Sequence, residues 1–181
     1  VRAVSYLCAM GQGIIIKYKS LLPVTQHTPT ITMGEGDTPL VRSHHLESEL
    51  GCGELYFKLE GCNPTGSFKD YGMTTAVTQA KKLGSSVVAW ASTGNTSASM
   101  AAYCARAGLR AVVFIPEGQI AFGKLSQSLD YGALTLQLEG NFDVDMGLVR
   151  ELSDETDLYL MNSINPFRLE GQQTVMLELL E

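Results

Sequence analysis

Apolar and polar positions alternate in a regular way from residue 55 to the end of the chain. Short apolar runs, typical of strands buried on both faces, take turns with amphipathic stretches of helical period. The pattern predicts strands at residues 55–59, 87–91, 111–115, 133–138 and 158–161, and helices at residues 68–83, 96–107, 123–131, 142–155 and from 169 onward. This order predicts right-handed βαβ units, and so an α/β fold whose mostly parallel, twisted sheet is covered by helices on both faces.

The first part of the chain has a different pattern. A helix is predicted over residues 14–21, ending before Pro23, and residues 28–42 carry glycines and prolines that predict an ordered loop leading into a short strand. Residues 1–13 give no clear signal. The chain begins with Val1 and ends inside a helical pattern without a stop signal, so we expect a fragment whose C-terminal part is missing.

Composition narrows the possible functions. A chain of 181 residues that is 45% hydrophobic can build a sizeable core, and its net charge of −6 argues against nucleic-acid and anionic membrane partners. No apolar run is long enough to span a bilayer. The four cysteines are scattered without C-x-x-C spacing, which indicates reduced thiols and a cytoplasmic protein. The three histidines lack the spacing of metal ligands, so we expect no metal site.

The run NPTGSFKD at residues 63–70 contains the most informative lysine of the chain. Pro64 and Gly66 favour a turn, Ser67 offers an N-cap, and Lys69 then lies at the start of a helix. The positive end of that helix and partial burial would lower the pKa of Lys69. Such an amine can hold an aldehyde cofactor as a Schiff base, whereas the ordinary alternative is a solvated lysine on a helix surface.

A second run, STGNTS at residues 92–97, follows the next buried strand. Gly94 permits a close backbone approach, and the N–H groups at the start of the following helix form an anion site suited to the carboxylate of an amino acid. Asn95 can hydrogen-bond a ring oxygen. A simple helix cap would need one polar side chain here, so the cluster around a glycine favours a binding site.

Three further donors follow other strands, namely Lys124, Ser163 and Arg168. Each can donate to a phosphate, although each taken alone is more simply interpreted as a surface or turn residue. Because the carboxyl ends of parallel strands open at one edge of a sheet, residues 92–97, 116–118 and 162–163 are expected to form one site.

Over residues 14–181 the chain resembles the N-terminal half of the threonine synthases, which are pyridoxal-phosphate-dependent enzymes of fold type II. The resemblance rests on the two runs above and on GEGDTPL, KLEG, IPEG, GKL and NSINPFR at residues 34–40, 58–61, 115–118, 123–125 and 162–168. It implies conversion of O-phospho-L-homoserine and water to L-threonine and phosphate. It also implies the start of a large domain within residues 1–54, an α/β region with the small-domain part at residues 55–181, and a homodimer when the protein is full length.

The resemblance also implies roles for the site residues. Lys69 would hold pyridoxal phosphate and later move protons, and Asn95 would contact the ring oxygen of this cofactor. The substrate carboxylate would lie against hydroxyl and amide side chains, those of Ser92, Thr93, Asn95 and Thr96. The substrate phosphate would be bound by Thr96 and by the three separate donors Lys124, Ser163 and Arg168.

Two departures from the family pattern stand out. The family usually has arginine after the Lys–Asp pair, where this chain has Tyr71, and Asp70 itself is given no chemical role. The loop that cradles the cofactor phosphate and the residue at the pyridine nitrogen lie downstream in the family. We therefore expect the fragment alone to be inactive.

Other functions stay open at this point. A different fold type II enzyme, such as a threonine or serine dehydratase, a cysteine synthase or a cysteate synthase, would share Lys69 and residues 92–97. A substrate phosphate would demand Lys124 and Arg168, for which a dehydratase has no use. A non-catalytic fragment that binds a phosphorylated metabolite is the alternative from another class.

Overall fold

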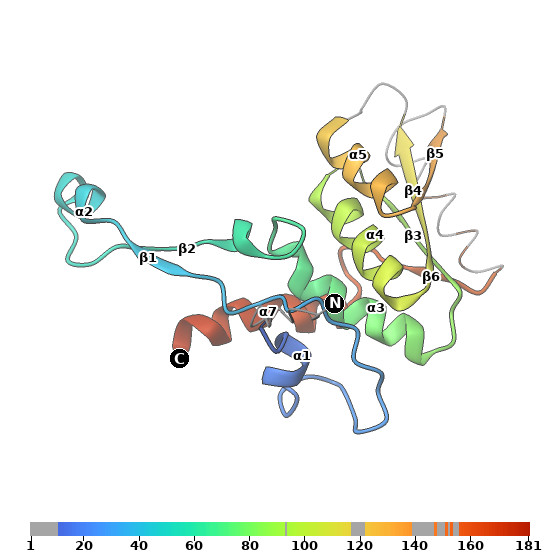
Figure 1. Cartoon of the computed structure of the whole chain (residues 1–181), viewed down its shortest axis with the longest axis horizontal. Helices are drawn as coiled ribbons and strands as arrows, with labels where there is room; N and C mark the ends of the chain where they lie inside the picture. The colour runs from blue at the N-terminus through green and yellow to red at the C-terminus, as the bar shows by residue number, and fades with distance from the viewer. Residues whose placement is uncertain are drawn as a thin grey trace, which may run out of the picture.

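The centre of the protein is a four-stranded parallel sheet with strand order β5–β4–β3–β6 (Figure 1). The computed structural model describes residues 11–92, 94–116, 122–138, 147, 151, 153 and 156–181. The strands of the sheet are β3 (Val87–Ala91), β4 (Arg110–Pro116), β5 (Leu134–Leu138) and β6 (Leu158–Leu160). In the register of the sheet, Val87 pairs with both Arg110 and Leu158, and Val112 pairs with Leu134. The expected α/β fold with a parallel sheet is confirmed.

Helices with the expected periodicity pack beside this sheet. They are α3 (Lys69–Lys82), α4 (Asn95–Ala107), α5 (Phe122–Asp130) and α7 (Pro166–Leu180). Figure 1 shows α4 and α5 on the same side of the sheet. Met73, Val77 and Ala80 of α3 recur at helical spacing and are fully buried in one core cluster with strands β3 and β4. The helix expected over residues 142–155 lies outside the described residues, apart from residues 147, 151 and 153.

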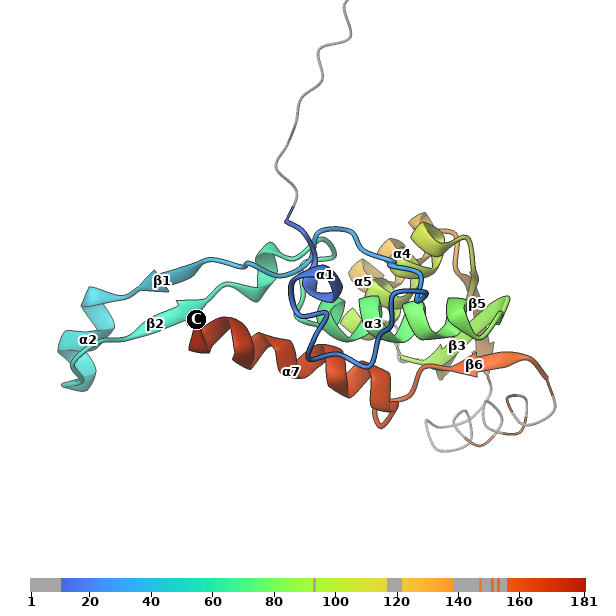
Figure 2. The same cartoon turned by 90° about the horizontal axis from the view of Figure 1, so that it is seen from below.

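A separate two-stranded ribbon projects from the body of the molecule (Figure 2). It consists of β1 (Leu40–Arg42) and β2 (Tyr56–Lys58), paired antiparallel, with the unpredicted helix α2 (His44–Leu50) at its tip. The strand expected at residues 55–59 is therefore present, but it does not join the parallel sheet as the alternation suggested. A parallel pairing needs a crossover, whereas the connection through α2 folds the chain back on itself and lets the two strands pair antiparallel.

Two helix boundaries differ from those expected. The first helix, α1 (Ile14–Lys17), is a single turn that ends well before Pro23. The last helix begins at Pro166 rather than at residue 169, because Asn165 caps it by accepting the backbone N–H of Arg168 at 3.2 Å. Proline suits the first helical position, since its missing N–H would have no partner there. Of the helices in the described ranges, none is long and apolar enough to cross a bilayer.

Helices α3 and α7 cross at close range, and two glycines make this possible. A Cβ atom on Gly171 would lie 2.1 Å from the carbonyl oxygen of Tyr71, and one on Gly72 would lie 2.8 Å from Cγ of Arg168. Thr75 adds a hydrogen bond across the crossing, from Oγ1 to the carbonyl of Phe167 at 2.7 Å. The crossing places the first turn of α7, with Arg168, beside the first turn of α3, which carries Lys69.

Candidate active site

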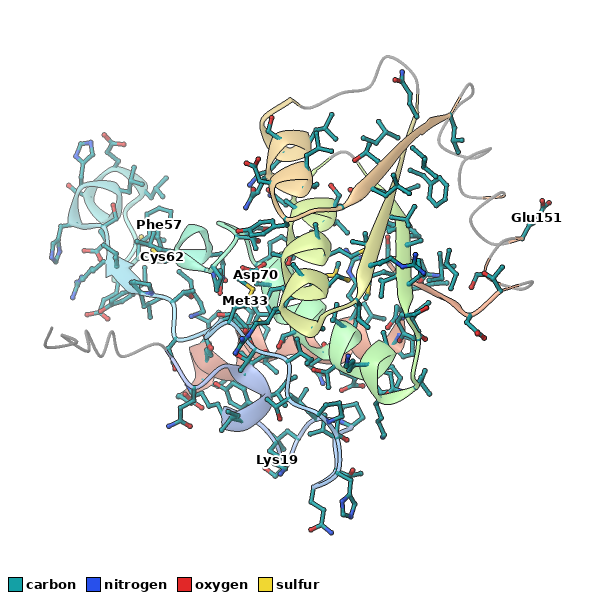
Figure 3. The ribbon with its side chains drawn as sticks, turned by 45° about the vertical axis from the view of Figure 1, so that its right-hand side comes forward. Lys19, Met33, Phe57, Cys62, Asp70 and Glu151 are labelled. Atoms are coloured by element: carbon teal, nitrogen blue, oxygen red, sulfur yellow. The ribbon has the colours of Figure 1, made fainter. Side chains whose placement is uncertain are left out.

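The turn before Lys69 is held by a buried carboxylate. Asp70 is fully buried, and it accepts the backbone N–H of Thr65 at 2.7 Å, the hydroxyl of Thr65 at 2.5 Å and the hydroxyl of Ser99 at 2.5 Å. Burial raises the pKa of Asp70, and these hydrogen bonds act in the opposite direction. Figure 3 shows Asp70 against α4, the helix that carries Ser99. Asp70, to which the sequence assigned no role, thus ties the turn before the lysine to α4.

Other bonds complete this turn. Ser67 Oγ accepts the backbone N–H of Lys69 at 3.1 Å, although the N-cap residue of α3 is Phe68 rather than Ser67. Gly66 has a φ of 76°, in the left-handed region that favours glycine. Asn63 is buried, accepts the backbone N–H of Gly36 at 3.1 Å and donates to the Glu60 carboxylate at 2.8 Å. The turn is therefore joined to the loop that precedes β1 as well as to α4.

Lys69 has the surroundings of a lysine whose ammonium form is disfavoured. Its side chain is partly buried. Its Nζ atom lies 4.0 Å from the centre of the Phe68 ring, a cation–π contact that favours the ammonium form and so opposes the effect of burial. Burial lowers the pKa of Lys69, and the positive charge of Arg168 lowers it further. Among the described residues no carboxylate forms an ion pair with Lys69. An amine of this kind loses its proton more readily than a solvated lysine, as attachment to an aldehyde requires.

The second predicted turn, before α4, has fewer internal bonds. Ser92 Oγ accepts the backbone N–H of Gly94 at 3.3 Å, and Ser97 Oγ donates to the carbonyl of Gly94 at 2.8 Å. Gly94 is the N-cap residue, and no side chain among the described residues caps the helix. Asn95 is exposed, whereas Thr96 is buried. The start of α4 therefore offers backbone N–H groups suited to an anion. Thr93 lies outside the described residues.

Arg168 is a buried cation at the start of α7. Only 4% of the surface of Arg168 is exposed. Its guanidinium donates to Thr96 Oγ1 at 3.3 Å and to the carbonyl of Met161 at 3.4 Å. Among the described residues, its Nε atom has no hydrogen-bond partner, and neither does the buried Oδ1 atom of Asn162. Within the described ranges no carboxylate pairs with Arg168, and burial lowers its pKa. A buried charge without a counter-charge is costly, so this arrangement favours binding of an anion.

Lys124 is linked to the candidate site by hydrogen bonds through a second side chain of α5. Its Nζ atom donates to Gln127 Oε1 at 3.2 Å, and Gln127 Nε2 donates to the carbonyl of Thr65 at 3.3 Å. Thr65 belongs to the Lys69 turn, so Lys124 is linked to that turn although it follows a different strand. Sequence reasoning missed Gln127, because a glutamine inside a helix is usually solvated and carries no local signal.

The structure thus brings together only part of the predicted set. Arg168 contacts Thr96 directly and acts electrostatically on Lys69, and Lys124 joins them through Gln127. Ser163 and Asn95 are exposed, and residues 117–118 lie outside the described residues. A cavity of about 600 Å³ lies beside the turn before Lys69, where it is lined by Pro64 of that turn and by Met33 and Cys62, which Figure 3 labels. None of the predicted site residues that the structure describes lines this cavity.

The comparisons with known proteins agree with this geometry. Residues 31–181 match the family model of pyridoxal-phosphate dependent enzymes. The chain belongs to this family. The expected pyridoxal-phosphate cofactor is thereby confirmed. Lys69 fits such a group, because it is partly buried, its pKa is lowered, and no carboxylate in the described part of the chain pairs with it. Family relatives include the threonine synthase of Methanocaldococcus jannaschii, 55% identical over 163 residues that make up 90% of this chain and 40% of that protein.

Further family members extend the comparison. The threonine synthase of Halalkalibacterium halodurans is 53% identical over 168 residues, which are 93% of this chain and 47% of that protein. The chain therefore spans less than half the length of these two relatives. Among solved structures, the serine racemase of maize is 26% identical with a TM-score of 0.69, over 80% of this chain and 45% of that one. The likeness to the threonine synthases expected from the sequence motifs is confirmed.

Proposed function

We propose that the whole protein converts O-phospho-L-homoserine and water to L-threonine and phosphate, with pyridoxal phosphate as its cofactor. The observation that carries the proposal is the buried guanidinium of Arg168, which has no carboxylate partner among the described residues and whose charge lowers the pKa of Lys69. The motifs and the identity of about half the residues with threonine synthases support the same activity.

Each candidate residue has a role in this proposal. Lys69 holds the cofactor and moves protons at the substrate carbons, while the cofactor ring supplies an electron sink for the negative charge that develops there. Asn95 contacts the ring oxygen of the cofactor. The substrate carboxylate is bound by the start of α4 through Ser92, Thr93, Asn95 and Thr96. The leaving phosphate is bound by Thr96, Lys124, Ser163 and Arg168, which stabilise its charge as it departs.

The cations favour a phosphorylated substrate over an unphosphorylated one. Arg168 offers a planar fork of donors to a phosphate, and Lys124 adds a point charge. A dehydratase acting on threonine or serine would leave both cations without a substrate partner. The buried Nε atom of Arg168, which has no partner in the described part of the chain, is hard to explain in that case, because burying an unsatisfied donor costs about 1–3 kcal/mol.

Further parts of the proposal concern the whole protein. We infer a homodimer, with the large domain beginning within residues 1–54 and the small-domain part within residues 55–181. We also infer a cytoplasmic location and a small-molecule substrate rather than a nucleic acid. The free thiols of Cys52, Cys62 and Cys104 support a reducing compartment. The fragment alone is expected to have little activity.

The decisive experiment supplies the full-length protein with O-phospho-L-homoserine, L-threonine or O-phospho-L-serine in parallel. We expect equal amounts of phosphate and L-threonine from the first compound. In Lys69→Ala, kcat should fall by at least about 10³-fold and the visible absorbance of the bound cofactor should be lost, whereas Lys81→Ala, an exposed lysine on the same helix, should behave as the parent. A keto acid formed from L-threonine, without phosphate release from O-phospho-L-homoserine, would show that the proposal is wrong.

A further inference from the structure

One glutamine on α5 joins two parts of the site that lie far apart in the sequence. Gln127 is one helical turn after Lys124, and both side chains are partly buried. Its Oε1 atom accepts from Lys124 Nζ at 3.2 Å, and its Nε2 atom donates to the carbonyl of Thr65 at 3.3 Å. A single amide thus spans the distance between α5 and the turn before Lys69.

We propose that Gln127 is a positioning residue for the substrate phosphate, which holds the ammonium of Lys124 toward the site at Lys69. The inference rests on the proposed function, since it requires Lys124 to bind a phosphate. An ammonium donates three hydrogen bonds, and the bond to Gln127 uses one of them. The remaining donors of Lys124 have no hydrogen-bond partner among the described residues and can bind phosphate oxygens, and the orientation of the side chain is set before the substrate arrives.

An amide suits both neighbours of Gln127. The ammonium of Lys124 can only donate and the carbonyl of Thr65 can only accept, so the residue between them must present one acceptor and one donor. Glutamate would pair with Lys124 but place a carboxylate oxygen against the carbonyl oxygen of Thr65. Glutamate would also neutralise the charge that Lys124 offers to a phosphate. Methionine keeps the length of the side chain and loses both bonds.

The Thr65 carbonyl is a firm anchor because the rest of Thr65 is fixed. Its backbone N–H and its hydroxyl both donate to the buried carboxylate of Asp70, at 2.7 Å and 2.5 Å. Asp70 directly follows Lys69 in the chain. Gln127 therefore connects Lys124 to the same rigid turn that positions Lys69. Lys124, which binds the phosphate, and Lys69, which moves protons, are thus held by one turn.

The test uses full-length protein carrying Gln127→Glu or Gln127→Met, with Gln137→Glu as the matched control on the exposed side of β5. The measurements are KM and kcat for O-phospho-L-homoserine, the inhibition constant of inorganic phosphate, and the thermal midpoint. Both Gln127 variants should raise KM and the phosphate inhibition constant by roughly ten-fold, as expected for one bond to a charged group. Their kcat should change much less, their thermal midpoint should stay close to that of the parent, and Gln137→Glu should match the parent throughout.

Two results would overturn the proposal. One is a Gln127→Glu protein whose KM and phosphate inhibition constant equal those of the parent, or, if that variant does not fold, the same result for Gln127→Met. The other is a fall in kcat at unchanged KM, which would assign Gln127 to the support of Lys69 alone. If the parent itself releases no phosphate from O-phospho-L-homoserine, the proposed function fails. Calorimetric titration of parent and variants with inorganic phosphate then decides the role of Gln127 by the same roughly ten-fold criterion.

Discussion

Two turns meet at the candidate active site, and they use their polar side chains in opposite ways. In the turn before α3, the polar groups bind one another: Asp70 accepts from Thr65 and Ser99, and Asn63 bridges Glu60 and Gly36. In the turn before α4, no side chain that the structure describes caps the helix, and Asn95 is exposed. The first turn is a rigid support for Lys69, whereas the second keeps its donors available for a ligand.

The difference has a physical basis in what each turn must do. A lysine that holds a covalently bound group needs a backbone in a fixed position. Buried hydrogen bonds whose donors and acceptors are all paired make the turn before it rigid. A turn that binds the carboxylate of a substrate needs donors that are free for it, and water can accept their hydrogen bonds when no substrate is bound. Substitutions in the first turn should therefore lower the stability of the protein, and substitutions around the second should weaken ligand binding.

The largest expected effect on stability comes from Asp70→Asn in the full-length protein. Asparagine would turn one acceptor into a donor that faces the donors of Thr65 and Ser99, and burial prevents water from replacing the lost bonds. We expect the free energy of unfolding to fall by about 2–3 kcal/mol. Urea denaturation measures this change, with the exposed Asp130→Asn as the control, for which a change within about 0.5 kcal/mol is expected. An equally small change in Asp70→Asn would contradict the view of this turn as a rigid support.

Arg168→Met should have the opposite pattern, with a large effect on binding and a small one on stability. Methionine removes the cation that the phosphate needs, so KM for O-phospho-L-homoserine should rise by roughly 10²-fold. It also removes a buried charge that lacks a carboxylate partner in the described part of the chain, so the unfolding free energy without phosphate should be unchanged or higher. A loss of stability with KM unchanged would show that Arg168 is a structural cation instead.

The same variant tests the electrostatic link between Arg168 at the start of α7 and Lys69 at the start of α3. Burial lowers the pKa of Lys69 most, and the charge of Arg168 lowers it further, so Arg168→Met should raise this pKa without restoring the ordinary value. Only the neutral amine reacts with an aldehyde, so the reaction slows as the pH falls through this pKa. The rate at which cofactor-free protein reacts with pyridoxal phosphate should therefore reach half its maximum at a higher pH in the variant. A midpoint that is unchanged or moves to lower pH would refute the link.

The comparison also shows what the sequence could reveal. The spacing of Met73, Val77 and Ala80 is local, and it predicts a helix face whatever the rest of the fold does. The position of residues 92–97 directly after a buried strand likewise predicted that they follow the carboxyl end of a strand in the parallel sheet, and the described residues of this run do follow β3. Periodicity therefore predicted the described strands of the parallel sheet and the helices beside it, and the motifs supplied the candidate site residues.

Features that depend on partners far along the chain could not be predicted. Ser99 meets Asp70 across 29 positions, and Gln127 meets Thr65 across 62. Gly171 resembles any other helical glycine until α3 is seen to pass within reach of its missing side chain. The antiparallel pairing of β2 had the same difficulty, because an apolar run does not indicate which strand it will pair with. These contacts decide how precisely the site is built.

The smallest expected effect belongs to Asn95→Ala, which tests the turn before α4 at an exposed residue. Because the Asn95 side chain does not cap α4, the unfolding free energy should stay within about 0.5 kcal/mol of the parent. If Asn95 contacts the cofactor ring, the affinity of the full-length protein for pyridoxal phosphate should fall roughly five-fold, as expected for one neutral hydrogen bond. Spectroscopic titration with the cofactor measures this affinity, and Gln137→Ala, at an exposed polar position of β5, is the control that should match the parent. Parent-like affinity in Asn95→Ala, combined with a clear loss of stability, would reverse the assignment and make this turn a support like the one before Lys69.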